Sequence, residues 1–194
     1  MIDHPNQYHR RSVRLKDYDY SSPGAYFVTA VTYQRECLLG KVVDGKMRLN
    51  EFGVIGNDEW FHTANLRPSI RLYPEEFTVM PNHVHGIIWI EEMNSENGRG
   101  AASLRPYAYQ DRQFDYPPDF HQNNVTPRSL GAIVRAYKSA VTYRINTIRN
   151  SCGLPVWQRN YYEHIIRDQS DLDSISNYIL INPDHWSEDQ EYIQ

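Results

Sequence analysis

The stretch of sequence that decides the fold is Thr78-Val79-Met80-Pro81-Asn82-His83-Val84-His85-Gly86-Ile87-Ile88-Trp89-Ile90. It predicts a buried β-strand that follows a tight turn at Pro81-Asn82. Side chains alternate between the faces of a strand, so His83 and His85 point the same way, roughly 7 Å apart at the backbone. Two imidazoles that converge from one strand can hold a metal ion. The alternative is a pair of partly exposed histidines at the start of a strand.

The segments on either side predict an alternation of strands and helices. Strands are predicted over residues 26–33, 69–80, 83–91 and 161–167, with a hairpin over 38–49 that turns at Asp44-Gly45. Helices are predicted over 50–64, with Asn50 as a possible cap, and over 128–150. A last helix, capped by Ser170 or Asp171, is expected to run to about residue 181, before Pro183.

Without the hairpin and the last helix, the order of elements is βαββαβ, the ferredoxin-like pattern. We therefore expect an α+β fold with an antiparallel sheet, two helices on one face, an extra hairpin and a C-terminal helix that carries Tyr178. The other face of the sheet is free to hold a site or a partner. Residues 1–194 are expected to form a single domain with a flexible insertion at 94–127, a segment rich in Gly, Pro, Asn, Gln and Arg.

Composition narrows the class of protein. Of the 194 residues, 40% are hydrophobic, which is enough for a proper core. Cys37 and Cys152 form neither a CxxC pair nor a zinc spacing, and they suggest a reducing compartment. With no signal-peptide pattern near Met1 and no apolar run long enough to span a bilayer, we expect a cytoplasmic protein without membrane contact.

The charges are unevenly distributed along the chain. The net charge of −4 argues at first sight against binding to nucleic acids. However, residues 128–167 carry a net charge of +6, whereas residues 168–194 carry −7. A basic block beside an acidic block suggests one face built for an anion and another that faces away from it. Ordinary solvated helix faces are the alternative.

Tyr178 and Asn182 are four residues apart and so share a face of the predicted last helix, about 5–6 Å apart at their Cβ atoms. Asn182 stands just before Pro183, where its amide can reach a ligand. A phenol is a poor nucleophile at its ordinary pKa of about 10, so a nearby cation must lower that pKa or stabilise the attacked group. The alternative is an ordinary helix tyrosine that packs on the sheet, because the chain has 15 tyrosines.

Several blocks of the sequence are similar to one known family. His83-Val84-His85 resembles the His-hydrophobic-His motif of the HUH nucleases, and residues 178–183 with Trp186 resemble the tyrosine helix of the single-tyrosine HUH transposases. Further similar blocks lie in order at residues 14–20, 23–29, 80–88, 130–139 and 157–164. The strongest resemblance is to the branch called REP-associated tyrosine transposases, and it runs through most of the chain.

This resemblance implies an enzyme that cuts single-stranded DNA near imperfect-palindrome hairpins and transfers the strand. Tyr178 would attack the scissile phosphate and stay joined to the 5′ side, which leaves a free 3′-OH. His83, His85 and Asn182 would hold one divalent ion, Mg²⁺ or Mn²⁺. Related single-tyrosine transposases have Gln as the third ligand, so the shorter Asn182 requires a closer helix. The protein would act as a monomer or a homodimer.

Other residues compete for these roles. His164 is a rival metal ligand, and Tyr161 and Tyr162 are rival nucleophiles. Tyr162 could also stack on unpaired bases. We expect single-stranded or hairpin DNA to contact basic and aromatic side chains of the long helix, the following strand and the N-terminal segment: Arg135, Lys138, Arg144, Trp157, Arg159, Arg167, Arg14 and Lys16.

Two alternative functions use the same fold. The first is a non-catalytic DNA-binding regulator, which would have no need to keep all of the four site residues. The second is a metal-dependent phosphoesterase with water as the nucleophile. That function needs an extra carboxylate near the ion, and the histidine strand offers only Glu91 and Glu92, far along it.

Overall fold

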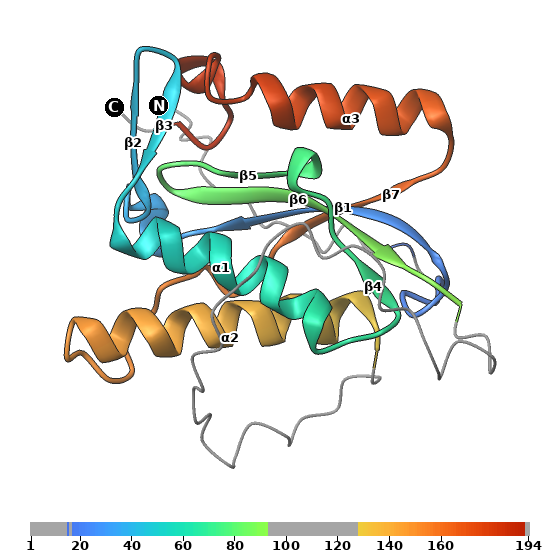
Figure 1. Cartoon of the computed structure of the whole chain (residues 1–194), viewed down its shortest axis with the longest axis horizontal. Helices are drawn as coiled ribbons and strands as arrows, with labels where there is room; N and C mark the ends of the chain where they lie inside the picture. Colours follow the sequence, from blue (N-terminus) through green and yellow to red (C-terminus); the bar gives the residue numbers. More distant parts are fainter. Residues whose placement is uncertain (1–14, 16, 93–127, 193–194) are drawn as a thin grey trace, which may run out of the picture.

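The computed structural model describes residue 15 and residues 17–92 and 128–192, and its centre is a pair of long antiparallel strands. β1 (Gly24–Val31) pairs with β6 (His83–Ile90) along its whole length, so that Thr29 lies opposite His85. Nearly all the residues of both strands are buried. Helices lie on both faces of the sheet (Figure 1), which explains why β6 is a continuous apolar run rather than an alternating one.

The remaining strands extend the sheet on both sides. β7 (Tyr162–Ile166) pairs with β1, while β4 (Ile70–Arg71) and β5 (Phe77–Val79) both pair with β6, and every pairing is antiparallel. The strand order is β4-β6-β1-β7 with β5 beside β6, which confirms the ferredoxin-like α+β prediction. The prediction of a single strand over 69–80 is wrong. A short 3-10 helix (Pro74–Glu76) interrupts it, because Pro74 cannot donate a ladder hydrogen bond.

Helices α1 (Glu51–Asn65) and α2 (Leu130–Ile148) cover one face of the sheet (Figure 1). The predicted cap is confirmed, since the Asn50 side chain accepts a hydrogen bond from the Gly53 amide. Ser129 caps α2 in the same way. The apolar residues that fall at helical spacing in α2 are all buried in the main core: Leu130, Ile133, Val134, Tyr137, Val141 and Ile145.

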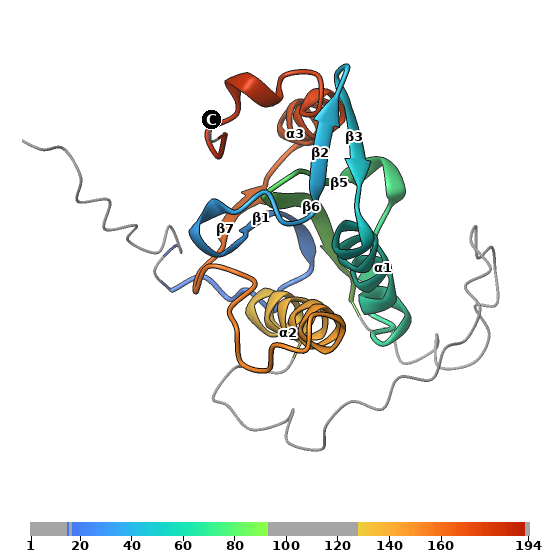
Figure 2. The ribbon, with the colours of Figure 1, turned by 90° about the vertical axis from the view of Figure 1, so that its left-hand side faces the viewer.

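Helix α3 (Gln169–Ile181) lies on the opposite face of the sheet, as Figure 2 shows from the side. Its N-cap is Asp168 and not the predicted Ser170 or Asp171, because the Asp168 carboxylate accepts from the Asp171 amide at 2.9 Å. A second small core holds α3 on the sheet, where Ile179 packs with Ala25, Phe27 and Ile87. This packing brings the C-terminal end of α3 over the start of β6.

The predicted hairpin is present as β2 (Gly40–Val43) and β3 (Lys46–Leu49). Asp44 and Gly45 both have positive φ angles, 51° and 68°, as a two-residue hairpin turn requires. Two further 3-10 helices, Tyr33–Arg35 and Trp186–Glu188, follow β1 and α3. The predicted insertion at 94–127 and the basic residues Arg14 and Lys16 lie outside the described residues. No helix in the described part of the chain is long and apolar enough to cross a membrane.

Candidate active site

The two histidines of β6 lie side by side under α3. Their ring centroids are 4.3 Å apart, and both side chains are almost completely buried. They point to the same face of the sheet, as the spacing of two along a strand predicts. The ring of Trp186 lies 5.8 Å from that of His83, so the segment after α3 closes the site on that side.

Each imidazole makes a hydrogen bond through its Nδ1 atom on the side away from Asp189. His83 Nδ1 is 2.8 Å from Oδ1 of Asn82, and His85 Nδ1 is 2.8 Å from Oγ1 of Thr29 on the neighbouring strand. The Nε2 atoms are therefore left to face the site. Hydrogen bonds of this kind orient the histidine ligands of metal sites.

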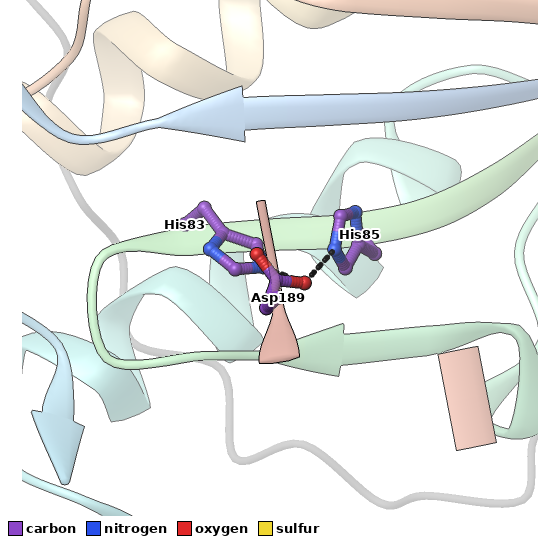
Figure 3. A group of neighbouring side chains, drawn as sticks. All are labelled: His83, His85 and Asp189. Carbon is purple, nitrogen blue, oxygen red and sulfur yellow. Dashed lines mark ion pairs between the residues drawn. The ribbon is translucent and has the colours of Figure 1, made fainter. Parts of the chain in front are cut away.

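Asp189 is the site residue that the sequence did not reveal. Its side chain is 1% exposed, and its Oδ2 atom is 3.8 Å from Nε2 of His85 and 4.0 Å from Nε2 of His83 (Figure 3). The sequence predicts that the acidic block at 168–194 lies on a face turned away from any anion. Asp189 breaks that expectation, because the chain doubles back after Pro183 and brings this one carboxylate to the histidines.

Helix α3 adds the predicted tyrosine and amide. The Tyr178 hydroxyl donates to Oδ2 of Asp189 at 3.0 Å and lies 3.2 Å from Nε2 of His85. The Asn182 amide donates to the same Asp189 oxygen at 2.7 Å. Tyr178 is 39% exposed, so its ring borders solvent, while its hydroxyl contacts His85 and Asp189. The structure thus brings together all four residues predicted from the sequence around one carboxylate.

Burial controls the protonation of the site. It lowers the pKa of both imidazoles below the ordinary value, and for His83 the neighbouring His85 adds to the effect. Both rings are therefore neutral near pH 7, the form that binds metals. Burial also raises the pKa of Tyr178 well above that of free tyrosine, and the charge of Asp189 adds to this. The phenol therefore keeps its proton unless a positive charge enters the site.

Asp189 itself stays ionised. Burial alone would raise the pKa of its carboxyl, but the neighbouring His85 ring and the Asn182 amide outweigh that effect and hold the pKa well below its usual range. The site therefore contains one negative charge and two neutral imidazoles. Such a site attracts a cation.

The donor atoms also fit a metal ion. Those of His83, His85 and Asp189 all lie within 4.8 Å of one another. Among the described residues, His83 Nε2 and Asn182 Oδ1 are buried acceptors without a hydrogen-bond partner. Leaving such a group unpaired costs about 1–3 kcal/mol, and a cation would satisfy both. This group of side chains could therefore hold a metal ion.

The rival residues are not part of the group formed by His83, His85 and Asp189. Nε2 of His164 is 2.8 Å from Oδ2 of Asp171, which ties β7 to the start of α3, and His164 does not belong to the His83–His85–Asp189 group. Tyr162 is 40% exposed at the edge strand of the sheet, and its ring lies 6.2 Å from that of Phe27. Tyr161 packs against the main core.

A groove with a volume of about 2080 Å³ runs along α2 and the segment that leads into β7. Its lining includes four of the predicted DNA-binding residues, Arg135, Lys138, Trp157 and Arg159, together with Tyr161 and Tyr162. It also reaches Arg35 and Gln190. Because Gln190 follows Asp189 directly, the groove extends to the segment that enters the site.

The predicted DNA-binding residues differ in how available they are. Arg135, Arg159 and Arg167 are exposed, but Arg167 is not part of the groove lining. Trp157 is only 7% exposed and packs in the main core. The Lys138 ammonium donates to the carbonyl oxygen of Gln158 at 2.6 Å, so it also holds the groove wall in place.

Arg144 lies on another side of α2. Its guanidinium donates to Oε1 of Glu59 on α1 at 2.8 Å, and it is not among the residues that line the groove. Arg144 is therefore not part of the groove surface.

Comparison with known proteins places this geometry in context. No family model matches the chain. An uncharacterized protein of Haemophilus influenzae is 40% identical over 186 residues, which is 96% of this chain and 94% of that protein. The structure of a REP-associated tyrosine transposase bound to a REP hairpin covers 88% of this chain and 72% of the other, with a TM-score of 0.53 and 19% identity.

A crystal structure of a proposed transposase from Deinococcus radiodurans R1 covers 86% of this chain and 94% of the other. With a TM-score of 0.44 and 16% identity, it is too distant to carry an argument. At the level of the fold, the resemblance predicted from the sequence is confirmed. The chain therefore belongs to one family with the Haemophilus influenzae protein, and its fold is that of a REP-associated tyrosine transposase.

Proposed function

We propose that this protein is a metal-dependent endonuclease and strand transferase of single-stranded DNA that works through a phosphotyrosine intermediate. The observation that carries the proposal is the position of the Tyr178 hydroxyl, 3.2 Å from Nε2 of His85 and 3.0 Å from Oδ2 of Asp189. A packing role on the sheet needs only the ring of Tyr178 and does not require its hydroxyl to contact His85 and Asp189. The fold shared with a REP-associated tyrosine transposase bound to a REP hairpin agrees with this proposal.

The proposed covalent step exchanges one phosphodiester bond for another. The Tyr178 oxygen forms a bond to phosphorus while the bond from phosphorus to the 3′ oxygen breaks. The phenol proton leaves along the hydrogen bond that Tyr178 already donates to Asp189 and ends on the released 3′ oxygen, so that Asp189 is ionised before and after the step. The products are a 5′-phosphotyrosine and a free 3′-OH. Attack by a different 3′-OH reverses the step and transfers the strand.

The metal would be Mg²⁺ or Mn²⁺, held by Nε2 of His83, Nε2 of His85 and the amide oxygen of Asn182. Asp189 would lie beside it and balance part of its charge. When bound, the ion would polarise the phosphoryl oxygens and favour the ionised phenol. Two imidazole ligands suit Mn²⁺ better than Mg²⁺, which prefers oxygen ligands.

We also propose that the groove along α2 guides the DNA strand to the site. Arg135 and Arg159 are exposed cations on its lining, suited to phosphates, and the exposed ring of Tyr162 is suited to stacking on an unpaired base. Lys138 adds a positive charge at the wall. Three members of the predicted DNA-binding set, Arg135, Lys138 and Arg159, thus share one continuous surface with Tyr162.

One observation favours a second candidate, the phosphoesterase that uses water. Such an enzyme needs a carboxylate near its metal, and Asp189 supplies the carboxylate that the sequence alone did not offer. In that case Tyr178 would only orient the phosphate, and no covalent protein–DNA product would form. The two candidates therefore differ in a product that can be isolated.

The test is incubation with single-stranded DNA from the flanks of its own gene, with Mn²⁺ and with a chelator as the control. A 3′-labelled strand should give a denaturation-resistant protein adduct, while a 5′-labelled strand should give a free fragment that ends in 3′-OH. Tyr178→Phe should abolish both products. Tyr73→Phe is the matched control, since Tyr73 is similarly exposed, at 43%, but contacts Trp89 instead of the site.

Cleavage without an adduct, unchanged in Tyr178→Phe, would favour the phosphoesterase. An adduct that disappears in Tyr162→Phe and persists in Tyr178→Phe would move the nucleophile to β7. Hairpin binding without any cleavage in Mn²⁺ or Mg²⁺ would favour the non-catalytic regulator.

A further inference from the structure

Asn82, the residue before His83, is completely buried and uses its whole side-chain amide. Its nitrogen donates to the carbonyl oxygen of Glu191 at 2.7 Å and to that of Arg35 at 3.2 Å. Its oxygen is 2.8 Å from Nδ1 of His83. Three segments far apart in the sequence therefore meet at this one side chain.

These contacts fix the orientation of the amide. Backbone carbonyl oxygens can only accept hydrogen bonds, so the amide atom that faces Glu191 and Arg35 must be the NH₂ group. The atom that faces His83 is then the amide oxygen, which can only accept. A hydrogen bond between it and His83 therefore requires a proton on Nδ1.

The proton on Nδ1 decides what the other ring nitrogen can do. A neutral imidazole carries one proton, so Nε2 of His83 is left as a bare lone pair. This is the atom that has no hydrogen-bond partner among the described residues and that faces Asp189 at 4.0 Å. A ring with its proton on Nε2 instead would present a donor to the site and could not bind a cation.

The hydrogen-bond partner of His85 does not select a tautomer. The Thr29 hydroxyl is 2.8 Å from Nδ1 of His85, and a hydroxyl can either donate or accept. Thr29 therefore orients the ring without selecting its tautomer. His83 faces an amide oxygen, which only accepts, whereas His85 faces a hydroxyl, which can donate or accept. A substitution of Thr29 is therefore a matched control for a substitution of Asn82.

We propose that Asn82 is a positioning residue that locks His83 in the Nδ1–H tautomer and so prepares its Nε2 atom to bind the metal before any ion arrives. The inference rests on the proposed function only for the use made of that atom. The tautomer itself is a property of the metal-free protein.

The experiment is ¹⁵N NMR of the histidine side chains in the metal-free protein, followed by titration with Mn²⁺. In the wild type, His83 should be a single Nδ1–H tautomer at neutral pH. In Asn82→Leu the preference should be lost, and Mn²⁺ affinity should fall about 10–100-fold, the usual effect of removing such a partner. Asn82→Asp keeps an acceptor toward Nδ1 but loses both N–H donors to the carbonyl oxygens of Glu191 and Arg35, so a folded Asn82→Asp protein should keep the Nδ1–H tautomer of His83.

Thr29→Val should leave the tautomer of His83 unchanged. A wild-type His83 with its proton on Nε2 would overturn the inference, even if Asn82→Leu failed to fold. An unchanged Mn²⁺ affinity in a folded Asn82→Leu would also overturn it. Absence of DNA cleavage would count against the proposed function and leave the tautomer measurement unaffected.

Discussion

Gly86 follows His85 on β6 at a point where the core leaves no room for a side chain. A Cβ atom there would lie 2.4 Å from Cζ2 of Trp60 and 2.8 Å from Cδ2 of Phe77. These rings are stacked with centroids 4.5 Å apart, and both are buried, so neither can swing out into solvent. We predict that Gly86→Ala lowers the free energy of unfolding by about 1–3 kcal/mol, the usual cost of overpacking a core.

Gly56→Ala is the matched control for this substitution. Gly56 lies inside α1, and a Cβ atom there would meet only the Tyr137 hydroxyl, at an ordinary 3.6 Å. Alanine is favoured over glycine in a helix by about 0.5–1 kcal/mol, so this variant should be slightly more stable than the wild type. Urea denaturation followed by circular dichroism measures both changes.

A second substitution tests the assigned cause. Two of the three clashing atoms, Cζ2 and Cη2 of Trp60, belong to the six-membered ring of the indole, and the shorter phenylalanine side chain does not carry atoms there. Trp60→Phe should therefore offset part of the damage in Gly86→Ala, with a favourable coupling of about 0.5–3 kcal/mol in a double-mutant cycle. Wild-type stability in Gly86→Ala, or strict additivity with Trp60→Phe, would refute the proposed packing.

Three further predictions concern metal and DNA. Mn²⁺ at 100 times its Kd should stabilise the wild type by about 2.7 kcal/mol in thermal unfolding, and equal stabilisation of His83→Ala would contradict the assigned ligand. DNA affinity should fall with salt, and Arg135→Ala with Arg159→Ala should flatten the log–log slope by about 1.4, since each phosphate contact with a single strand contributes about 0.7. An unchanged slope would show that the groove along α2 is not the surface that binds the DNA phosphates. Burial lowers the pKa of Lys138 to about 8, so DNA affinity should fall between pH 7 and pH 9 as the ammonium loses its proton. Lys138→Arg should remove that loss, and a persistent loss would assign the titration to another group.

Elements with strong local signals could be predicted from the sequence. The paired histidines follow from the alternation of side chains along a strand, and the burial of one face of α2 follows from its helical period. The Asn50 cap and the Asp44-Gly45 turn depend on local chemistry, so they could be predicted without knowledge of distant contacts. Tyr178 and Asn182 share a face because they are one helical turn apart.

The missed features depend on contacts that no local pattern records. Asp189 lies in a segment without helical or strand period, and only the path of the chain after α3 brings it to the histidines. Trp157 looks like an exposed stacking residue in the sequence, but the core buries it. Pro74 indicates a break in the strand predicted over 69–80, because proline cannot donate a ladder hydrogen bond. The residues on either side have a strand pattern, and the prediction followed that pattern.

The most direct test of the proposed chemistry is peptide mass spectrometry of the protein after reaction with single-stranded flanking DNA and Mn²⁺, followed by nuclease digestion. A nucleotide phosphate attached to Tyr178, absent from a reaction without metal, is the predicted result. Cleaved DNA with no modified tyrosine, or a modification on Tyr162 alone, would contradict the assignment of Tyr178 as the nucleophile.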